Sequence, residues 1–468
     1  MNPVDVAVVG GGVVGCAVAR RLARTRLRVA LLEAGPDVGA GTSKANTAIL
    51  HTGFDTKPGT AESALVARGH ALLGEYASRT GIPVERTGAL LVAWNEEQLA
   101  VLPSLAEQAA ANGYDRCDLV DAATCSRLEP HLGPGALGGL TVPDESIVCP
   151  WTPPIAFATE AVANGADLYR GCALHAAEPT ADGWELRTAA GVLEASWIVN
   201  AAGLHGDDVE RLLGHDGFTV TPRRGELVVF DKLARPLVRN ILLPVPTGRT
   251  KGVLVSPTVF GNVVLGPTAD DVDDKSDTAS TADGIAALLD HSRRILPRLL
   301  DEEVTAVYVG LRAATEESDY RLACRPGDGT VCLGGIRSTG LTAAMALAEW
   351  TAEQLGAAGL DVAERADAAG VHMPNLGEAF ARPYQDAERI AADPEYGTVL
   401  CHCERVTAGE LRDAFTSAVP PADLDGIRRR TRALMGRCQG FYCSAEVASR
   451  FARATGRPVD AVLAGAAP

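Results

Sequence analysis

The fold of this chain is decided by three stretches near its start: VDVAVV (residues 4–9), GGGVVG (residues 10–15) and RVALLE (residues 28–33). The first and last are short apolar runs rich in β-branched residues, which predict buried strands. Residues 13–25, between them, have a helical composition. A strand, a glycine-rich turn, a helix and a second strand form a βαβ unit, which predicts an α/β fold with a parallel sheet.

The glycine-rich turn has the G-x-G-x-x-G spacing of a dinucleotide-binding site. Gly10 permits the tight turn, Gly12 lets the backbone approach a pyrophosphate, and Gly15 lets the helix pack closely on the strand. The pyrophosphate would meet the positive end of the helix dipole. Glu33 ends the second strand, where a carboxylate accepts hydrogen bonds from ribose hydroxyls and disfavours a 2′-phosphate. Both FAD and NAD use such a turn, so the turn alone leaves the cofactor open.

Composition and charge restrict the kind of protein and its partners. The chain has 468 residues, of which 47% are hydrophobic and 22% charged, as in ordinary globular proteins. Its net charge of −16 disfavours nucleic acid and anionic lipid, but allows an anionic small substrate in a local basic pocket. No apolar run reaches the roughly 18 residues of a spanning helix, so we expect no integral membrane segment. We expect a cytoplasmic protein, with a peripheral membrane association through a partner as the alternative.

Helix and strand patterns alternate along the rest of the chain. Helices are predicted at 62–80, 96–112, 153–165, 282–300 and 342–357. Strands are predicted at 88–94, 184–189, 196–203, 226–231, 252–259 and 262–267. Together with the βαβ unit at the start, this mixture predicts an α/β domain with an inserted α+β part.

A resemblance to a known family begins in the segment GTSKANTAILHTG (residues 41–53). This segment resembles the flavin loop of the D-amino-acid-oxidase-like superfamily. More narrowly, it is similar to FAD-dependent glycerol-3-phosphate dehydrogenases and L-2-hydroxyglutarate dehydrogenases. The resemblance continues through NAAG (200–203), GLR (310–312) and GIRSTGLT (335–342), and covers almost the whole chain. It implies a Rossmann-like domain that binds FAD, with NAD as the weaker alternative, and an inserted substrate domain.

The same resemblance implies which residues contact FAD. They are Gly10, Gly12, Gly15, Glu33, Thr42, Ser43, Asn46, Thr47, Ala202, Gly203, Gly335, Arg337, Gly340, Leu341 and Thr342. Arg337 departs from the acidic or neutral residue expected before the Ser-x-Gly-Leu-Thr run. This arginine adds a positive charge near the flavin.

The groups that act on the substrate are also implied by the resemblance. His51 is the first candidate to accept the hydroxyl proton, and histidine changes its charge near neutral pH. Its alternative role is to pack and orient the flavin loop, and His205 is the second candidate. Arg312 and Arg224 match basic positions that face the substrate, with Lys251 assisting, and a guanidinium binds a carboxylate or phosphate in a bidentate manner. For each arginine the alternative is an ordinary salt bridge.

Four cysteines near the end of the chain form a second motif. Cys401 and Cys403 form a C-x-C pair, and Cys438 and Cys443 form a C-x-x-x-x-C pair. Four thiolates suit an iron–sulfur cluster or zinc, whereas a reducing cytoplasm disfavours disulfides. Residues 399–447 resemble the [2Fe–2S] domain of bacterioferritin-associated ferredoxin, which favours the cluster, and His402 is then a solvent-facing neighbour. Five arginines are expected to balance the negative charge of the thiolates: Arg428, Arg429, Arg430, Arg432 and Arg437.

We therefore expect three parts joined by a connector. The FAD-binding domain is expected at 1–85, 145–215 and 326–365, the substrate domain at 86–144 and 216–325, the connector at 366–395, and a small helical [2Fe–2S]-binding domain at 396–468. The connector is rich in Ala, Asp, Glu and Pro and is expected to wrap the surface.

The implied function is oxidation of sn-glycerol 3-phosphate to dihydroxyacetone phosphate. Electrons would pass from FAD to the cluster and on to an acceptor. The alternatives are another 2-hydroxy acid or polyol phosphate, notably L-2-hydroxyglutarate, or an amine or imino acid. A further alternative is a C-terminal domain that only docks a partner or binds structural zinc. Expected partners are a small anionic substrate and an electron-acceptor protein or quinone-linked subunit.

Overall fold

The βαβ unit at the start of the chain lies at the centre of a mainly parallel sheet. In the computed structural model, which describes residues 1–246 and 252–464, β1 (Val4–Val9) pairs in parallel with β2 (Val29–Leu32) and with β12 (Gly191–Asn200). Two further parallel strands, β9 (Asp167–Tyr169) and β20 (Thr330–Gly334), give the order β20-β12-β1-β2-β9. The predicted α/β fold is confirmed.

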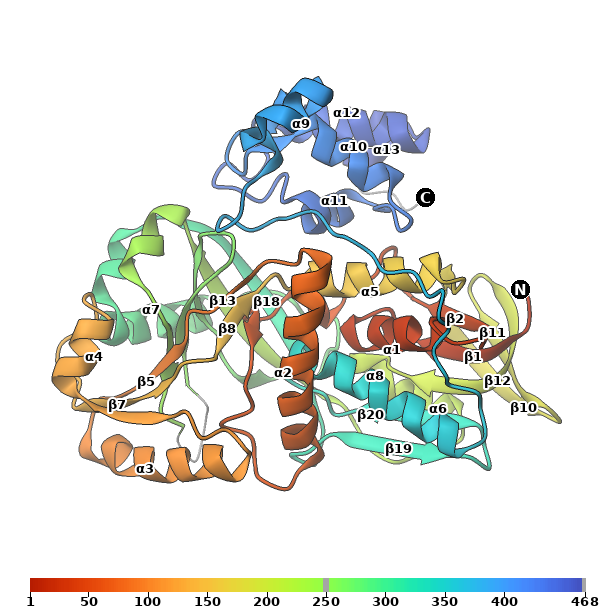
Figure 1. The fold of residues 1–468 in the computed structure, drawn as a ribbon, viewed down its shortest axis with the longest axis horizontal. Coiled ribbons are helices and arrows are strands. Elements are labelled where there is room, and N and C mark those ends of the chain that lie inside the picture. Colours follow the sequence, from red (N-terminus) through yellow and green to blue (C-terminus); the bar gives the residue numbers. More distant parts are fainter. Residues whose placement is uncertain (247–251, 465–468) are drawn as a thin grey trace.

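Helices cover one face of this sheet. α1 (Val13–Ala23) packs against α5 (Thr152–Ala163) and α8 (Gly340–Ala357), and α2 (Ala61–Thr80) packs against α8 (Figure 1). α1 has three alanines and one glycine among its eleven residues and is buried along most of its length, so its neighbours can approach closely. The sheet is extended by antiparallel strands, which are β10 (Leu174–Thr180), β11 (Gly183–Thr188) and β19 (Arg321–Arg325).

A second, mostly antiparallel sheet stands beside the first, at the left of Figure 1. Its order is β17-β13-β16-β15-β14-β5-β7-β6, and β18 pairs with β13. The bounds are β5 (Ala89–Ala93), β6 (Asp118–Asp121), β7 (Gly138–Val142), β13 (Thr221–Phe230), β14 (Ile241–Pro244), β15 (Leu254–Pro257), β16 (Val263–Gly266), β17 (Asp270–Asp271) and β18 (Val304–Ala314). A separate small sheet joins β3 (Ile49–Leu50), β8 (Ser146–Val148) and β4 (Val84–Glu85). The remaining helices of this region are α3 (Glu96–Ala111), α4 (Ala122–Leu128) and α7 (Ala282–Ile295).

The helices predicted from the sequence are present as α2, α3, α5, α7 and α8. The pattern predicted at 282–300 stops earlier, because Pro297 cannot continue the hydrogen bonding of α7 and begins a separate 3₁₀ turn. The long strand β18 was not predicted, although it borders the site described below.

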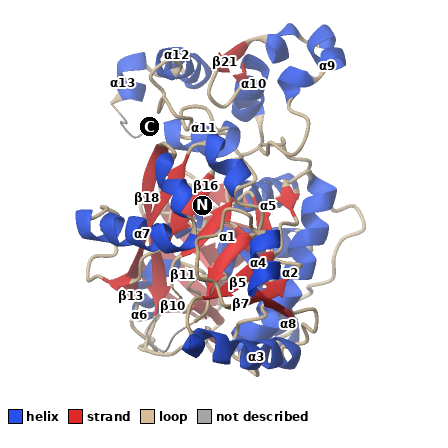
Figure 2. Cartoon of the chain, turned by 90° about the vertical axis from the view of Figure 1, so that its left-hand side faces the viewer, coloured by secondary structure: helices blue, strands red, loops and turns tan. Residues whose placement is uncertain are grey.

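The C-terminal part is small and mainly helical, as expected, and sits above both sheets (Figures 1 and 2). It contains β21 (Val399–Cys401), β22 (Val406–Thr407), α10 (Ala408–Thr416), α11 (Leu424–Thr431), α12 (Ser444–Thr455) and α13 (Val459–Leu463). Of these helices, α11 lies next to the rest of the molecule.

The segment between α8 and this part runs along the surface (Figure 1). Its backbone is fixed at several points: Met373 N donates to Thr80 O at 2.7 Å, and Glu378 N donates to Val259 O at 2.8 Å. Lys232 adds an ion pair to Glu378 at 2.7 Å. The C-terminal part is therefore attached by an ordered connection rather than by a loose linker.

Candidate cofactor and catalytic site

A cavity of about 1010 Å³ lies where the two sheets and the C-terminal part meet. Its wall includes the glycine turn after β1, the end of β2, residues 40–48, β18 and α11. Its size is at the upper end of the roughly 300–1,000 Å³ that is typical of ligand pockets, so it can take an extended ligand.

The glycine turn forms one end of the cavity wall. Gly10 has a φ of +107°, and a Cβ there would lie 2.5 Å from Ala201 O, so only glycine fits. Gly12 also lines the cavity and precedes α1, whose N-terminus has no side-chain cap at that residue. Backbone N–H groups at a helix start favour an anion such as a pyrophosphate.

Glu33 lines the cavity and also holds the turn together. Its carboxylate accepts hydrogen bonds from Gly11 N at 2.7 Å and Gly35 N at 2.6 Å. Burial raises the pKa of Glu33, although these two hydrogen bonds and the charge of Arg429 act in the opposite direction. Each carboxylate oxygen has a further lone pair, so hydrogen bonding to a ribose remains available.

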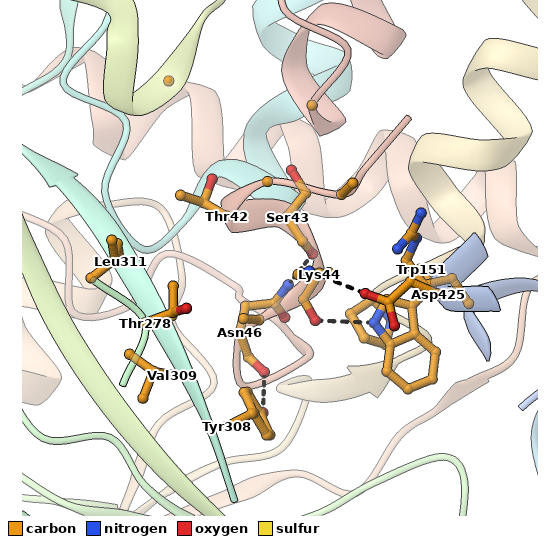
Figure 3. A pocket seen from close by; sticks show the side chains of 18 of the residues that line it. Thr42, Ser43, Lys44, Asn46, Trp151, Thr278, Tyr308, Val309, Leu311 and Asp425 are labelled. Carbon is orange, nitrogen blue, oxygen red and sulfur yellow. Dashed lines mark hydrogen bonds and ion pairs between the residues drawn. The ribbon is translucent and has the colours of Figure 1, made fainter. Parts of the chain in front are cut away.

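The loop at residues 42–48 is held in shape by Asn46, as Figure 3 shows. Asn46 Nδ2 donates to Ser43 O at 2.8 Å, and Asn46 Oδ1 accepts from Ala48 N at 2.7 Å. Tyr308 OH, from β18, donates to Asn46 O at 2.7 Å. The second sheet is thereby joined directly to this loop. The residues of the loop that were predicted from the sequence and line the cavity are Thr42, Ser43, Asn46 and Thr47.

Other predicted cofactor residues fall into two groups. Ala202 and Gly203, which follow β12, line the cavity. The others do not: they are Gly15, Gly335, Arg337, Gly340, Leu341 and Thr342. Thr342 nevertheless reaches the flavin-loop segment, because its hydroxyl accepts a hydrogen bond from His51 N at 3.1 Å. The Arg337 guanidinium donates to Ser318 O in a surface loop.

His51 lies three residues beyond Ala48, where its segment leaves the cavity wall. Its Nδ1 is 3.3 Å from Oε2 of Glu145, whose side chain is completely buried. Glu145 Oε1 also accepts hydrogen bonds from Thr52 N at 2.7 Å and Thr52 Oγ1 at 2.9 Å. The carboxylate is thus fixed in place and can orient the imidazole so that Nε2 is the proton acceptor. His205 differs, because its side chain is 64% exposed and contacts Asp208 at 2.9 Å.

Arg312 follows Leu311, the last residue of β18 in the cavity wall. Its guanidinium donates to Thr268 O and, at 3.3 Å, to Arg224 O. Burial lowers the pKa of Arg312 to about 10. Arg224 pairs with Asp277 at 3.3 Å. Neither arginine lines the cavity. Lys251 lies outside the described residues.

The four cysteines of the C-terminal part form two pairs. Cys401 is hydrogen-bonded to Cys443, and Cys403 to Cys438. The hydrogen bond from Cys443 lowers the pKa of Cys401 to about 6. Across residues 1–246 and 252–464, no three His, Cys, Asp or Glu side chains form a group that could hold one metal ion. Two pairs of thiols match the ligand set of a binuclear cluster, with two thiolates for each iron.

The backbone around these cysteines is strained. Non-glycine residues with left-handed backbone conformations surround the two pairs, and they are Arg405, Arg432, Leu434 and Gln439. Such conformations cost free energy and are concentrated at functional sites. They bring backbone N–H groups toward the sulfurs: the amide of Leu434 is hydrogen-bonded to both Cys401 and Cys443. N–H···S bonds of this kind help to set the reduction potential of a cluster.

The five arginines near the cysteines are directed to carboxylates instead of the thiolates. Arg430 binds both oxygens of the buried Asp37, and Arg429 donates to the same carboxylate at 2.9 Å. Arg432 pairs with Glu404 at 2.7 Å, Arg437 with Glu303 at 2.6 Å, and Arg428 with Asp425 at 2.9 Å. We expected these arginines to balance the charge of the thiolates, and this expectation was wrong. The sequence could not show their carboxylate partners, because Asp37 and Glu303 are brought near only by the fold.

The sequence analysis also missed an aromatic stack where the three parts of the molecule meet. Trp151 and Phe260 are stacked with ring centroids 4.9 Å apart, and the guanidinium of Arg432 lies 4.0 Å from the Phe260 ring. Trp151 Nε1 donates to Lys44 O at 3.0 Å (Figure 3). All three stacked residues line the cavity. No sequence pattern connects them, because they lie on segments far apart along the chain.

Comparisons with known proteins assign both parts of the chain. Residues 5–354 match the FAD dependent oxidoreductase family, and residues 399–453 match the BFD-like [2Fe-2S] binding domain. The expected cofactors, FAD and a [2Fe–2S] cluster, are confirmed at this level. No helix in the described ranges is long and apolar enough to cross a bilayer.

Individual relatives are similar over most of the chain. A glycerol 3-phosphate dehydrogenase from Caloramator mitchellensis is 32% identical, over 97% of this chain and 94% of that protein. The structure of the L-α-glycerophosphate oxidase from Mycoplasma pneumoniae with FAD bound has a TM-score of 0.76 and 28% identity, and covers 80% of this chain and 99% of that one. A mitochondrial L-2-hydroxyglutarate dehydrogenase from Caenorhabditis elegans is 30% identical over 57% of this chain and 63% of its own length.

Proposed function

Because the chain belongs to the family of FAD-dependent oxidoreductases, we propose that it oxidises sn-glycerol 3-phosphate to dihydroxyacetone phosphate and passes the electrons to a [2Fe–2S] cluster in its C-terminal domain. The observation that carries this proposal is the 32% identity to a glycerol 3-phosphate dehydrogenase over 97% of the chain, cysteine domain included. When bound, FAD would accept the hydride that leaves the C2 carbon of the substrate.

The residues proposed to hold FAD are those that line the cavity. Gly10 and Gly12 line the cavity, where glycines let the backbone approach a diphosphate, and Glu33 is available to a ribose. The loop around Asn46 accepts a hydrogen bond from Tyr308 and closes the cavity toward β18. A preformed wall of this kind binds a ligand with little reorganisation.

His51 is proposed to take the proton of the C2 hydroxyl while the hydride leaves C2. Its contact with the buried Glu145 supports this role, because a fixed carboxylate orients the ring and stabilises its protonated form. Arg312 follows Leu311, the last residue of β18 in the cavity wall, and is proposed to attract the substrate phosphate. C2 loses one hydride and its hydroxyl loses one proton, so that C2 becomes a ketone.

Cys401, Cys403, Cys438 and Cys443 are proposed to hold the cluster. Four thiolates in two pairs supply the ligands that two irons need. The amide of Leu434 contacts the thiols, and the Leu434 residue also lines the cavity, so the cysteine loops border the proposed flavin site. We further infer an electron acceptor, either a protein or a quinone-linked subunit, that takes the electrons from the cluster.

The test is anaerobic reduction of the purified protein by a panel of substrates. We expect glycerol 3-phosphate to bleach the flavin absorbance and to produce the electron-paramagnetic signal of a reduced [2Fe–2S] cluster. Bleaching by L-2-hydroxyglutarate or an amino acid, without bleaching by glycerol 3-phosphate, would contradict the proposed substrate. Stoichiometric zinc in place of about two irons per chain would contradict the electron-transfer role.

A further inference from the structure

The cavity wall includes positive charges that come from the C-terminal domain. Three arginines on or next to α11 line the same cavity as Gly10, Gly12 and Glu33, and they are Arg428, Arg429 and Arg432. α11 therefore lies against the proposed dinucleotide site, although it belongs to the domain of the cysteines. The structure of the relative from Mycoplasma pneumoniae covers 80% of this chain and 99% of its own.

Within the part of the chain that the structure describes, two of these arginines each have one donor nitrogen without a partner. The Nε atoms of Arg428 and Arg429 are buried and make no hydrogen bond within the described residues. The Arg429 side chain is only 5% exposed, so water cannot replace the missing partner. A buried, unpaired N–H on a charged group costs free energy unless a ligand accepts it.

The other cations of the cavity wall are already paired with carboxylates, Lys44 and Lys275 through Nζ and Arg432 through Nε. Lys44 contacts Asp425 at 3.5 Å, and Arg432 pairs with Glu404 at 2.7 Å. Lys275 contacts two carboxylates, at 2.6 and 2.8 Å. Arg428 and Arg429 also have carboxylate partners, but only through their Nη groups, which leaves the Nε donors for an anion.

The position of Arg429 indicates which anion this is. Arg429 donates to Asp37, four residues after Glu33, and lines the same cavity as Glu33, which stands at the predicted ribose end. The charge of Arg429 opposes the rise that burial causes in the pKa of Glu33. In a dinucleotide the diphosphate is attached to this ribose. The substrate phosphate, by contrast, is proposed to lie near Arg312, which is outside this wall.

We propose that Arg428 and Arg429 bind the diphosphate of FAD, so that the iron–sulfur domain forms part of the FAD site. The domain then has two roles, since it closes the cofactor cavity as well as holding the cysteines. This inference rests on the proposed placement of FAD in the cavity. It predicts that FAD affinity depends on residues more than 380 positions away from the glycine turn in the sequence.

The experiment compares four arginine variants. Each protein is stripped of FAD and titrated with FAD, and the dissociation constant is measured by flavin fluorescence. Arg428→Gln removes a donor whose carboxylate partner is on the same helix, so the domain stays docked. Arg429→Gln removes both a donor and a docking contact. Arg430→Gln is its matched control, because Arg430 docks on Asp37 without lining the cavity, and Arg453→Gln, on the exposed side of α12, controls for net charge.

We expect Arg428→Gln to raise the FAD dissociation constant about 10- to 100-fold, as for a lost charged hydrogen bond. Arg429→Gln should weaken FAD binding more than Arg430→Gln does, and Arg453→Gln should leave it unchanged. The proposal is overturned if Arg428→Gln binds FAD as tightly as the wild type. It is also overturned if the variants raise only the KM for glycerol 3-phosphate, because the arginines then bind the substrate phosphate. A wild-type protein that holds no FAD would refute the proposed function itself, independently of these variants.

Discussion

Two histidines are candidates for the proton acceptor, and their surroundings distinguish them. His51 is 20% exposed and contacts a carboxylate that is itself completely buried. His205 lines the cavity but is 64% exposed, and its partner Asp208 also binds Lys275 at 2.8 Å. A general base must be held in one orientation to be effective, and only His51 meets this condition.

We therefore predict that His51→Ala lowers the rate of flavin reduction by glycerol 3-phosphate roughly 10²- to 10⁴-fold, the usual contribution of a positioned base. FAD content should stay unchanged, because His51 does not line the cavity. Stopped-flow absorbance measures the rate. His205→Ala serves as the matched control and should remain close to wild type. A larger loss in His205→Ala than in His51→Ala would reverse the assignment.

The two central helices α2 and α8 cross at a point where there is room only for glycine. A Cβ on Gly69 of α2 would lie 2.2 Å from Thr342 O of α8. Thr342 in turn accepts the backbone hydrogen bond from His51. A wider crossing would therefore move the segment that carries the proposed base. Gly74, five residues later on the same helix, faces open space, because a Cβ there would meet no atom within 4 Å.

These two glycines make a matched pair of substitutions. Gly69→Ala should destabilise the protein by about 1–3 kcal/mol through overpacking, and should slow flavin reduction by displacing His51. Gly74→Ala should stabilise the protein by up to about 1 kcal/mol, because alanine is the better helix former and meets no obstacle. Thermal unfolding measures both effects. Equal shifts in the same direction would contradict the described packing of α2 on α8.

The two parts of the molecule are joined by a buried ion-pair cluster. Asp37, in the loop after β2, is fully buried and binds Arg429 and Arg430 of α11, with Arg170 3.6 Å away. Removing one partner of such a cluster leaves charge buried without compensation, which costs more than the pair contributes. The position of the cysteine domain over the cavity therefore depends strongly on one carboxylate.

Asp37→Asn should loosen the C-terminal domain, with a loss of about 3–5 kcal/mol in docking free energy. We expect hydrogen exchange to accelerate in α11 and the connector to become sensitive to protease, while β1 and β12 stay protected. Asp425→Asn is the control, because its pair with Lys44 is exposed and worth at most about 1 kcal/mol, and its other partner, Arg428, is on the same helix. Uniform exchange across the whole chain in Asp37→Asn would show that the two domains unfold as one unit instead.

Much of the fold follows from local sequence alone. The turn at Gly10 and Gly12 and the flanking strands are specified by residues within one βαβ unit, because backbone sterics and hydrophobic periodicity act over short distances. The four-cysteine motif is likewise visible as spacing, although the fold pairs Cys401 with Cys443 and Cys403 with Cys438. The same locality explains the predicted helices, and the end of α7 before Pro297, which the proline itself decides.

The tertiary structure alone decided which charged side chains pair with each other. Arg429 and Asp37 are 392 residues apart in the sequence, and Glu145 reaches Thr52 across 93 residues. The sequence shows that arginines crowd the cysteines, but a long side chain takes whichever carboxylate the fold brings near it. Burial then makes that pairing strong, because an unpaired charge in a low-dielectric interior is costly. Local sequence specified the elements of this protein, and long-range packing specified the partners of its buried charges.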